Sequence, residues 1–367
     1  MIYLLANIRF PTEKAHGIQV AAMAKAFAAR GSVTVVVPRR RTSGDAREVY
    51  GLPDTVKILR VPVLDTVRFG RIGFLFESLQ FAVLGGLAAA LRARRGDAVI
   101  SREYLAAAVP RLLGRVAAWE THRGEWNWAV RLSLALGVKV VAISRGLADD
   151  YAARGVPREK ILVAPDAVDF EKFCIAAGKE ECRAALGFSP EARLAVYAGH
   201  LYGWKGAQVL ARAAALLPAG WEVAIVGGTD LDLSRFRAEF GAVKNLRIVG
   251  RVPHGDVPRF LRAADVAVLP NLAEDALSAR YTSPLKLYEY LASGTPVVAS
   301  DIPSLRETLS PETAILVPPG DAAALAAAVA SVPDDASSAD RAARGQKIAR
   351  AASWTSRAES VASFARG

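Results

Sequence analysis

Cysteine is scarce in this chain of 367 residues, where only Cys174 and Cys182 occur. Two cysteines are too few for a disulfide framework, so a reducing, cytoplasmic setting is expected, and whether the two pair is left open. No cleavable leader is expected, because the segment after Met1, residues 2–6, has the apolar character of a core strand. A G-x-G-x-x-G motif after an early strand is also missing, which argues against a dinucleotide-dependent oxidoreductase.

Acidic residues are under-represented in the first half of the chain. Residues 1–165 hold 25 Lys and Arg against 13 Asp and Glu, whereas residues 166–367 hold 22 against 23. The excess behind the net charge of +11 therefore belongs to the first half. It suggests an anionic partner, such as an acidic membrane surface or a phosphorylated substrate. Nucleic acid is not expected as a partner, because no aromatic platform is interleaved with the basic residues. A solvated basic surface is the alternative.

Long uninterrupted apolar runs are also few. The most extended one, residues 69–91, is broken by Glu77 and Gln80 and is flanked by arginines. It approaches the length of a transmembrane helix, but its central polar residues and its place in an α/β pattern favour a core or interfacial helix. This stretch and the basic first half together predict peripheral contact with an anionic membrane, at the inner face of the cell membrane.

Alternating strands and helices are what the sequence has in quantity. Apolar, β-branched runs predict strands at residues 3–6, 33–37, 98–101, 117–120, 138–144, 161–164, 194–198, 222–226, 246–249, 266–269 and 297–300. Helical segments fall between them, and the pattern breaks at residues 165–169. We expect an α/β protein with two doubly wound Rossmann-like domains, residues 1–168 and 169–345, and a C-terminal helix at 346–367 that crosses back onto the first domain.

The stretch TSPLKLYEYLASGTPVVASD, residues 282–301, carries the clearest chemistry. Ser283 followed by Pro284 predicts a capped helix start, and the β-branched run after the helix predicts a buried strand. Free backbone N–H groups at this start, with Lys286 in the first turn, would form a phosphate site. Glu289 lies one turn further on, where it would accept hydrogen bonds from sugar hydroxyls. A capped core helix with solvent-facing Lys and Glu is the alternative.

A second anion site is predicted in the loop GHLYGWKG, residues 199–206. Lys205 opens the next helix, and a lysine there is unfavourable unless an anion lies between it and the helix dipole. Because both candidate sites follow strands of one parallel sheet, they predict a diphosphate ligand. Asp230 and Asp232 imitate a metal-binding D-x-D pair, but they stand at a helix start, so a capping or surface role is preferred.

In the first half of the chain, polar residues follow two of the predicted strands. The loop from Asn7 to His16 is far more polar than a simple connection needs, and such loops bind ligands in open α/β sheets. At the end of another strand, His122 lies beside Glu120 and Arg123, which favours a ligand contact over a merely satisfied polar residue.

Taken together, five segments resemble the GT4 family of retaining glycosyltransferases with the GT-B fold. They are KAHGIQVAAMAKAFA, SRGLADDYAARGVPREKILVAPDAVD, YAGHLYGWKG, GRVPHGDVPRFLRAADVAVLPN and SPLKLYEYLASGTPVVASD. They cover nearly the whole chain in order, and the last is similar to an S-P-L-K-x-x-E subgroup. The resemblance implies two Rossmann-like domains facing across an interdomain cleft and a nucleotide-diphosphate sugar as donor.

The resemblance also implies roles for residues of the second half. Lys205 and Gly206 would hold the donor diphosphate, together with Ser283 and the backbone N–H groups of Leu285 and Lys286. Glu289 matches the second glutamate of the family's E-x7-E motif and would bind the ribose hydroxyls. Val252, with Arg251 beside it, would present its backbone to the nucleobase.

In the first half, the resemblance places His16 and Gly17 at the phosphates and the acceptor. His122 would contact the transferred sugar, with Glu120 beside it. The residues predicted to be catalytic are therefore His122, Lys205 and Glu289.

Two positions depart from the family pattern. Tyr281 stands where the first glutamate of E-x7-E is expected, next to Thr282 in the sugar and acceptor region, and Glu274 or Asp275 is the candidate substitute. His200 stands where the family has a loop arginine, and Lys286 is the candidate that restores the charge.

These observations predict a metal-independent, retaining transferase that moves a hexose from a UDP-sugar, or second from GDP-mannose, to a hydroxyl of a glycan or lipid-linked sugar. Lys205, the helix start and Lys286 would stabilise the leaving diphosphate in place of a metal, so no cofactor is expected. One alternative is a nucleotide-sugar epimerase or hydrolase on the same scaffold, although its extra acid/base carboxylates were not found. The other is a catalytically silent sugar-nucleotide-binding protein.

Overall fold

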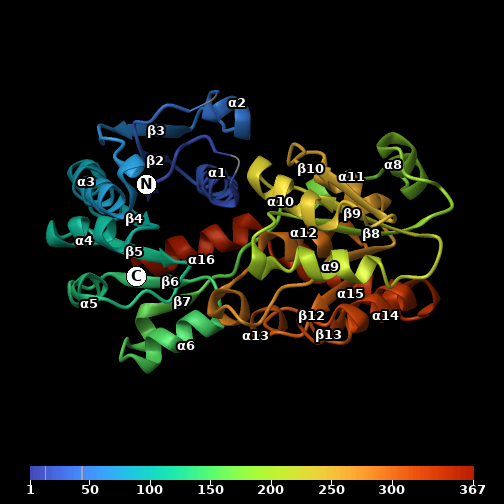
Figure 1. Ribbon diagram of the computed structural model, residues 1–367. Coiled ribbons are helices and arrows are strands. Elements are labelled where there is room, and N and C mark those ends of the chain that lie inside the picture. Colours follow the sequence, from blue (N-terminus) through green and yellow to red (C-terminus); the bar gives the residue numbers. More distant parts are fainter. Residues whose placement is uncertain (13, 43) are drawn as a thin grey trace. The chain divides into compact units, whose positions relative to one another are not determined.

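The computed structural model describes residues 1–12, 14–42 and 44–367, so the loop expected from Asn7 to His16 is described except at residue 13. The chain forms two compact units, Met1–Asp166 with Trp354–Gly367, and Ala167–Ser353 (Figure 1). The first division falls two residues before the expected boundary at 168. The returning segment begins at Trp354 rather than at residue 346, because α15 (Ser338–Ala351) belongs to the second unit.

The first unit is built on a seven-stranded parallel sheet with the order β3-β2-β1-β4-β5-β6-β7. The strands are β1 (Ile2–Leu5), β2 (Val33–Pro38), β3 (Val56–Val61), β4 (Ala98–Ser101), β5 (Val116–Thr121), β6 (Lys139–Ala142) and β7 (Ile161–Val163). The strand order reverses between β1 and β4. In open α/β sheets, ligands bind outside the carboxyl ends of the strands at such a switch point.

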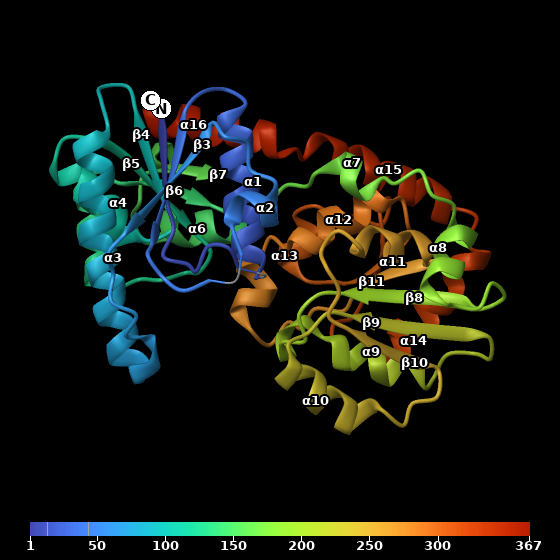
Figure 2. The same ribbon diagram turned by 90° about the horizontal axis from the view of Figure 1, so that it is seen from above.

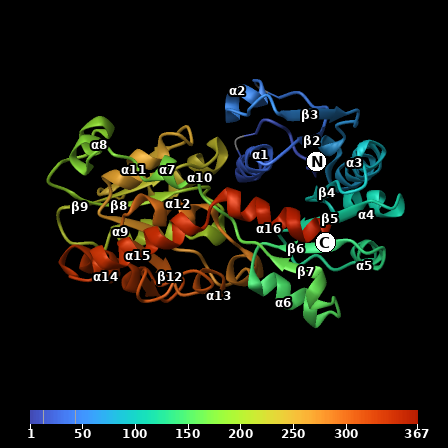
Figure 3. The same cartoon turned by 180° about the vertical axis from the view of Figure 1, so that it is seen from behind.

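Helices cover both faces of this sheet. On one face α3, α4 and α5 lie in a row, and on the other α1 packs against α16 (Figures 1 and 3). The helical segments are α1 (Ala15–Ala28), α2 (Ala46–Tyr50), a 3-10 turn at Val67–Phe69, α3 (Gly70–Arg92), α4 (Tyr104–Leu112), α5 (Trp128–Ala135), α6 (Arg145–Ala153), a 3-10 turn at Arg158–Lys160, and α16 (Trp354–Arg366). Ala358, Val361 and Ala365 of α16 are buried in the core of this unit, which explains why the chain end returns here.

The second unit has a six-stranded parallel sheet with the order β10-β9-β8-β11-β12-β13. The strands are β8 (Arg193–Ala198), β9 (Trp221–Val226), β10 (Leu246–Gly250), β11 (Val266–Leu269), β12 (Val297–Ser300) and β13 (Ile315–Val317). Its switch point lies between β8 and β11. Both sheets therefore have the doubly wound order that the sequence predicts.

Helices cover this second sheet in two layers. The contacts group α7, α8, α11, α12 and α15 in one layer and α9, α10 and α14 in the other (Figure 2). Their bounds are α7 (Phe170–Phe173), α8 (Lys179–Leu186), a 3-10 turn at Gly203–Lys205, α9 (Ala207–Ala214), α10 (Asp230–Phe240), α11 (Val257–Ala263), a π-helical turn at Leu277–Tyr281, α12 (Leu285–Ser293), α13 (Pro303–Arg306), α14 (Ala322–Ser331), a 3-10 turn at Val332–Asp334, and α15. Cys174 and Cys182 both lie in this unit as free thiols.

Candidate active site

The loop after β8 is held at the switch point of the second sheet by α12. The hydroxyl of Tyr290 accepts from the backbone N–H of Ala198 at 2.6 Å and donates to the carbonyl of Ala198 at 3.0 Å. Tyr197 donates its hydroxyl to the carbonyl of His200 at 2.5 Å. These bonds tie the two segments for which the sequence predicts anion sites to the same end of the same strand.

Gly206 ends this loop because no other residue fits there. Its φ is +74°, and a Cβ atom built on it would lie 1.7 Å from the carbonyl oxygen of Pro270. The segment after β11 thus packs directly onto the loop, and the backbone N–H of Leu272 donates to the carbonyl of Trp204 at 2.9 Å. Gly206 therefore has a packing role beside the predicted diphosphate contact.

Lys286 is the most unusual charged residue of the second unit. Only 5% of it is exposed, and its Nζ has no hydrogen-bond partner in the described part of the chain. Nζ lies 4.3 Å from the centre of the Tyr197 ring. Burial lowers the pKa of this ammonium group well below its ordinary value, and nearby Lys205 lowers it further, while Glu289 raises it. The Nζ of Lys286 is thus buried beside a second lysine and makes no hydrogen bond among the described residues, so its surroundings are electrostatically suited to an anion.

The helix that carries Lys286 begins without a side-chain cap. The N-cap residue of α12 is Pro284, not Ser283, and it makes no side-chain capping hydrogen bond. The predicted Ser283 cap is thus wrong, because the extended Pro284 takes the capping position and leaves the serine one residue further out. The helix ends at Ser293, and the strand after it, β12 (Val297–Ser300), has the bounds predicted from the sequence. The uncapped N–H groups of Leu285 and Lys286 can receive an anion.

Asn271, which follows β11, is a group that the sequence prediction missed. Its side chain is fully buried, and neither its amide oxygen nor its amide nitrogen has a partner among the described residues. Buried polar groups are nearly always hydrogen-bonded, so the amide beside the loop of Lys205 is a group whose hydrogen bonds a ligand could supply. The only sequence signal for it was its position directly after a strand.

Glu289 is buried and engaged by a histidine. Its Oε1 lies 2.8 Å from Nε2 of His254, whose Nδ1 lies 3.1 Å from Nζ of Lys172. His254 therefore orients the Glu289 carboxylate, which is predicted to bind the ribose, by contacting one of the two carboxylate oxygens. The histidine was missed, although it stands two residues after Val252, within a segment that the sequence had already marked.

Val252 packs against the hydrophobic core, and Arg251 beside it is exposed. The carbonyl of Gly250, just before them, accepts from the backbone N–H of Gly227 at 2.6 Å. The end of β10, which was predicted to meet a nucleobase, is therefore held by this hydrogen bond against the end of β9 at the same edge of the sheet.

The positions that depart from the family pattern have their own contacts. His200 stacks on Tyr202 with 5.1 Å between ring centres, and Tyr202 stacks on Trp204 at 6.5 Å. Tyr281 ends the π-helical turn, and Thr282 follows as its C-cap. Asp275 accepts from the backbone N–H of Leu277 at 2.8 Å, so it caps this turn from an exposed position.

Asp232 forms a capping box with Thr229 at the start of α10. Thr229 donates its hydroxyl to Asp232 Oδ2 at 2.7 Å, and the backbone N–H of Asp232 donates to Thr229 Oγ1 at 3.3 Å. The predicted capping role is confirmed for Asp232. Asp230 is exposed in the first turn of the same helix.

In the first unit, His16 and Gly17 lie in the first turn of α1. A Cβ atom on Gly17 would lie 2.4 Å from the hydroxyl of Tyr50 and 2.5 Å from Cγ2 of Thr12. Thr12 itself donates its backbone N–H to Tyr50 at 2.8 Å. The glycine is therefore required by close packing, and the first turn follows the carboxyl end of β1.

The end of β5 carries a carboxylate and imidazole pair. Nε2 of His122 lies 2.9 Å from Oε1 of Glu120. Burial, followed by Arg102, lowers the pKa of His122 to about 4, so its imidazole is neutral at neutral pH. For Glu120, burial acts to raise the pKa, but Arg357, His122 and Arg102 together hold it well below its ordinary value. The proton between them therefore sits on Nε2, which leaves Nδ1 of His122 as a hydrogen-bond acceptor.

Arg357 from α16 completes this pair. Its Nη2 donates to Oε2 of Glu120 at 2.8 Å, and its Nε donates to the carbonyl of Pro165 at 2.8 Å. Arg102 donates to Gln19, which in turn donates to Asp166 at 2.6 Å. The C-terminal helix thus contributes to the predicted site of the first unit, which sequence spacing cannot reveal.

We expect Asp166 to make folding stability fall with rising pH. Burial, its largest influence, raises the pKa of this carboxyl from 3.8 to about 7. A folded pKa above the unfolded one stabilises the protein below pH 3.8, and this stabilisation is lost as the pH rises through about 7. The Tm of the variant Asp166→Asn, relative to that of the wild type, should therefore rise as the pH increases from about 5 to about 8. Asp149→Asn, on the surface, is the matched control, and a Tm difference that does not change with pH would contradict the assignment.

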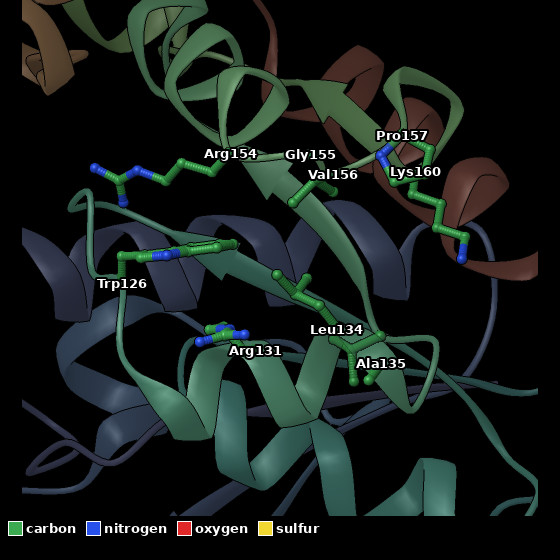
Figure 4. A pocket seen from close by; sticks show the side chains of 10 residues that line it. Trp126, Arg131, Leu134, Ala135, Arg154, Gly155, Val156, Pro157 and Lys160 are labelled. Atoms are coloured by element: carbon green, nitrogen blue, oxygen red, sulfur yellow. The ribbon is translucent and has the colours of Figure 1, made fainter.

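A cavity of about 280 Å³ lies elsewhere in the first unit. Figure 4 shows the Trp126 ring between the side chains of Arg131 and Arg154, with Leu134 and Val156 nearby. None of the predicted site residues lines it, so the candidate site is not this cavity.

Solved structures share this architecture over nearly the whole chain. Anabaena HepE in complex with UDP and glucose matches with a TM-score of 0.75 and 17% identity, covering 99% of this chain and 98% of that one. Sucrose-phosphate synthase of Thermosynechococcus elongatus matches with a TM-score of 0.77 and 20% identity, covering 98% and 97%. With its two doubly wound units, the protein has the GT-B fold.

Sequence comparisons identify the family. The family described as "Glycosyltransferase Family 4" matches residues 17–172, and "Glycosyl transferases group 1" matches residues 192–335. D-inositol 3-phosphate glycosyltransferase 1 of Catenulispora acidiphila is 30% identical over 218 residues, 55% of this chain and 50% of that protein. The chain thus spans about half the length of the curated relatives it matches. It belongs to the GT4 family of glycosyltransferases.

Proposed function

We propose that the protein is a retaining, metal-independent glycosyltransferase that transfers a hexose from a nucleotide-diphosphate sugar, preferably a UDP-sugar, to a hydroxyl acceptor. The observation that carries the proposal is the pair of buried, unpartnered groups on the second unit, Nζ of Lys286 and the amide of Asn271. Both lie by the switch point, where the uncapped start of α12 and Lys205 supply further positive potential.

The donor's diphosphate is the group that this site suits. Lys205, Lys286 and the N–H groups of Leu285 and Lys286 would bind its oxygens, and Glu289, oriented by His254, would accept hydrogen bonds from the ribose hydroxyls. Val252 would present its backbone to the base. UDP is preferred over GDP because the structural relative HepE is described in complex with UDP and glucose.

The chemistry follows from the charges. Breaking the bond between the anomeric carbon and the distal phosphate oxygen leaves negative charge on the phosphate and positive character on the sugar. The two lysines and the helix start would stabilise the first charge, which is the role that a metal plays in other transferases. The acceptor hydroxyl would attack from the face that the phosphate leaves, and its proton would pass to the departing phosphate oxygen, so the anomeric configuration is retained.

His122 would act on the sugar from the first unit. Its Nδ1, freed by the bond from Nε2 to Glu120, can accept a hydrogen bond from a sugar hydroxyl. Because the imidazole is neutral, it would not repel the positive character that develops on the sugar. His16 and Gly17, at the carboxyl end of β1, would lie at the phosphates and the acceptor.

A donor panel tests the proposal. UDP-glucose, UDP-galactose, UDP-N-acetylglucosamine and GDP-mannose are each incubated with the protein, with and without EDTA, and free nucleotide is measured. We expect slow release from one UDP-sugar, unchanged by EDTA, with NMR showing an α-configured sugar product from the α-configured donor. Nucleotide binding without turnover of any donor would instead support a silent binding protein, and loss of turnover with EDTA would contradict metal independence.

A further inference from the structure

The helix α3 has two halves of opposite character. With the turn before it, residues Val67–Arg92, it is by length and composition apolar enough to cross a membrane. Its second half is a core helix, where Phe81, Ala82, Ala89 and Ala90 are at most 2% exposed. A Cβ atom on Gly86 would lie 2.7 Å from Cβ of Val109, so α3 and α4 are in close contact there. This half cannot leave the protein without breaking the core.

The first half of α3 projects beyond the sheet. Glu77 is fully buried and forms an ion pair with Arg40, just after β2, and Ser78 accepts a hydrogen bond from Asn7, just after β1, at 3.5 Å. Positions 77 and 78 are therefore level with the carboxyl edge of the sheet. Residues before them extend past that edge, as Figure 2 shows for the free end of α3.

The projecting half exposes large apolar side chains. Its exposed members are Phe69 at 64%, Ile72 at 81%, Phe74 at 53%, Leu75 at 66% and Phe76 at 51%, and Leu79, 54% exposed, follows just after the sheet edge. Soluble proteins seldom expose apolar residues of this size side by side, and such patches mark interaction surfaces. Together, these exposed side chains are suited to entering the apolar layer of a membrane.

The charges around this tip favour an anionic bilayer as its partner. Between residues 66 and 96 the only acidic residue is Glu77, which is buried, whereas Arg68 and Arg71 stand exposed among the apolar side chains. The Arg68 guanidinium lies 4.8 Å from the centre of the Phe69 ring. The aliphatic part of Arg68 and the Phe69 ring therefore form one apolar surface with the charged guanidinium at its border. Trp128, 75% exposed at the start of α5, follows β5 at the same edge and is a residue type enriched at membrane interfaces.

We propose that the tip formed by residues 67–76, which are the 3-10 turn and the start of α3, inserts into the headgroup and acyl boundary of an anionic membrane while the rest of the helix stays in the core. Since His122 directly follows β5 at this same edge, the bilayer would lie on the side from which the first unit receives its acceptor. This last step rests on the proposed function, and it names the acceptor class as a hydroxyl carried by a membrane lipid.

Vesicle flotation of the full chain tests the insertion. Wild type should float with vesicles of phosphatidylcholine and phosphatidylglycerol, and part of this binding should persist at high salt because it is apolar. The double variant Ile72→Glu and Leu75→Glu should bind at least about tenfold more weakly. The matched control, Leu216→Glu with Leu231→Glu, alters two leucines of the second unit that are 58% and 62% exposed and should bind like wild type.

The contrary outcomes are equally distinct. Unchanged flotation of the Ile72→Glu and Leu75→Glu variant, or no flotation of wild type, would overturn the proposal. A wild-type dimer in solution that this variant splits would assign the face to a second copy of the chain instead.

UDP binding measured without vesicles reports on the proposed function separately, and the tip variant should leave it unchanged. With lipid extract in the vesicles, the variant should lose sugar transfer to lipid but keep donor hydrolysis. Donor hydrolysis without any transfer to lipid by wild type would contradict the acceptor class, and equal transfer by both proteins would contradict the role of the tip.

Discussion

Replacing Lys205 by Ala is expected to lower kcat/KM for donor hydrolysis by about a hundredfold to a thousandfold, the range seen when one charge-stabilising group is removed from a transition state. The reason lies in its surroundings. Lys286 is buried and its pKa lies well below the ordinary value, so Lys286 alone stabilises the charge of the leaving diphosphate poorly, and Lys205 is the second lysine of the site. Nucleotide release from the preferred donor is the measurement.

Two controls make the Lys205 result specific. Lys205→Arg keeps the charge and should retain much more activity than the alanine variant. Lys244→Ala removes an exposed lysine of the same unit and should behave like wild type. Near-normal kinetics for Lys205→Ala would show that the diphosphate binds elsewhere.

Replacing Glu289 by Ala should weaken UDP binding by about tenfold to a hundredfold, because a charged acceptor for two hydroxyls is lost. Binding of inorganic pyrophosphate should hardly change, since the carboxylate faces the pentose in this account and not the phosphates. Lys205→Ala, in contrast, should weaken both ligands. Calorimetric titration of each variant with UDP and with pyrophosphate separates the two roles.

A structural role for Glu289 would look different. If the carboxylate served only to hold His254, the alanine variant would lose thermal stability and bind both ligands like wild type. Glu239→Ala removes a glutamate that is 59% exposed and pairs with Arg212 at 3.5 Å, so it is the matched control for loss of charge.

Much of the fold was predictable because parallel strands buried on both faces have a strong signature. The runs at β1, β2, β8 and β11 are almost entirely Val, Ile, Leu and Ala, and each was placed within a residue or two. Two edge strands were missed. β3 carries Lys57 and Arg60 among its apolar residues, so it lacks the continuous apolar run of a central strand, and the apolar run of β13 is only three residues long.

The candidate site was predictable where local chemistry marks it. Lys205 and Lys286 were found because a lysine at a helix start needs an anion. Lys286 does lie in the first turn of α12, but the prediction that Lys205 opens the next helix is wrong, because Lys205 ends a 3-10 turn and α9 begins at Ala207 after the left-handed Gly206. The Ser283 cap was wrong because Ser-Pro admits two cap positions, and local sequence does not decide between them. His254 was missed because its partner Glu289 is 35 residues away.

Groups brought together by the tertiary fold were beyond sequence reasoning. Arg357 reaches Glu120 across 237 residues, and this contact exists only because the last helix returns to the first unit. Asn271 carries no motif of its own. Its significance comes from the absence of a hydrogen-bond partner around a buried amide in the described structure, which is a property of packing.

The central claim is that the start of α12 and the loop of Lys205 together hold the donor's diphosphate. A crystal structure of the protein with UDP tests it most directly. We predict phosphate oxygens on Lys205 and on the N–H groups of Leu285 and Lys286, with the ribose hydroxyls on Glu289. UDP bound in another place, with Lys286 still buried and unpartnered, would contradict the account.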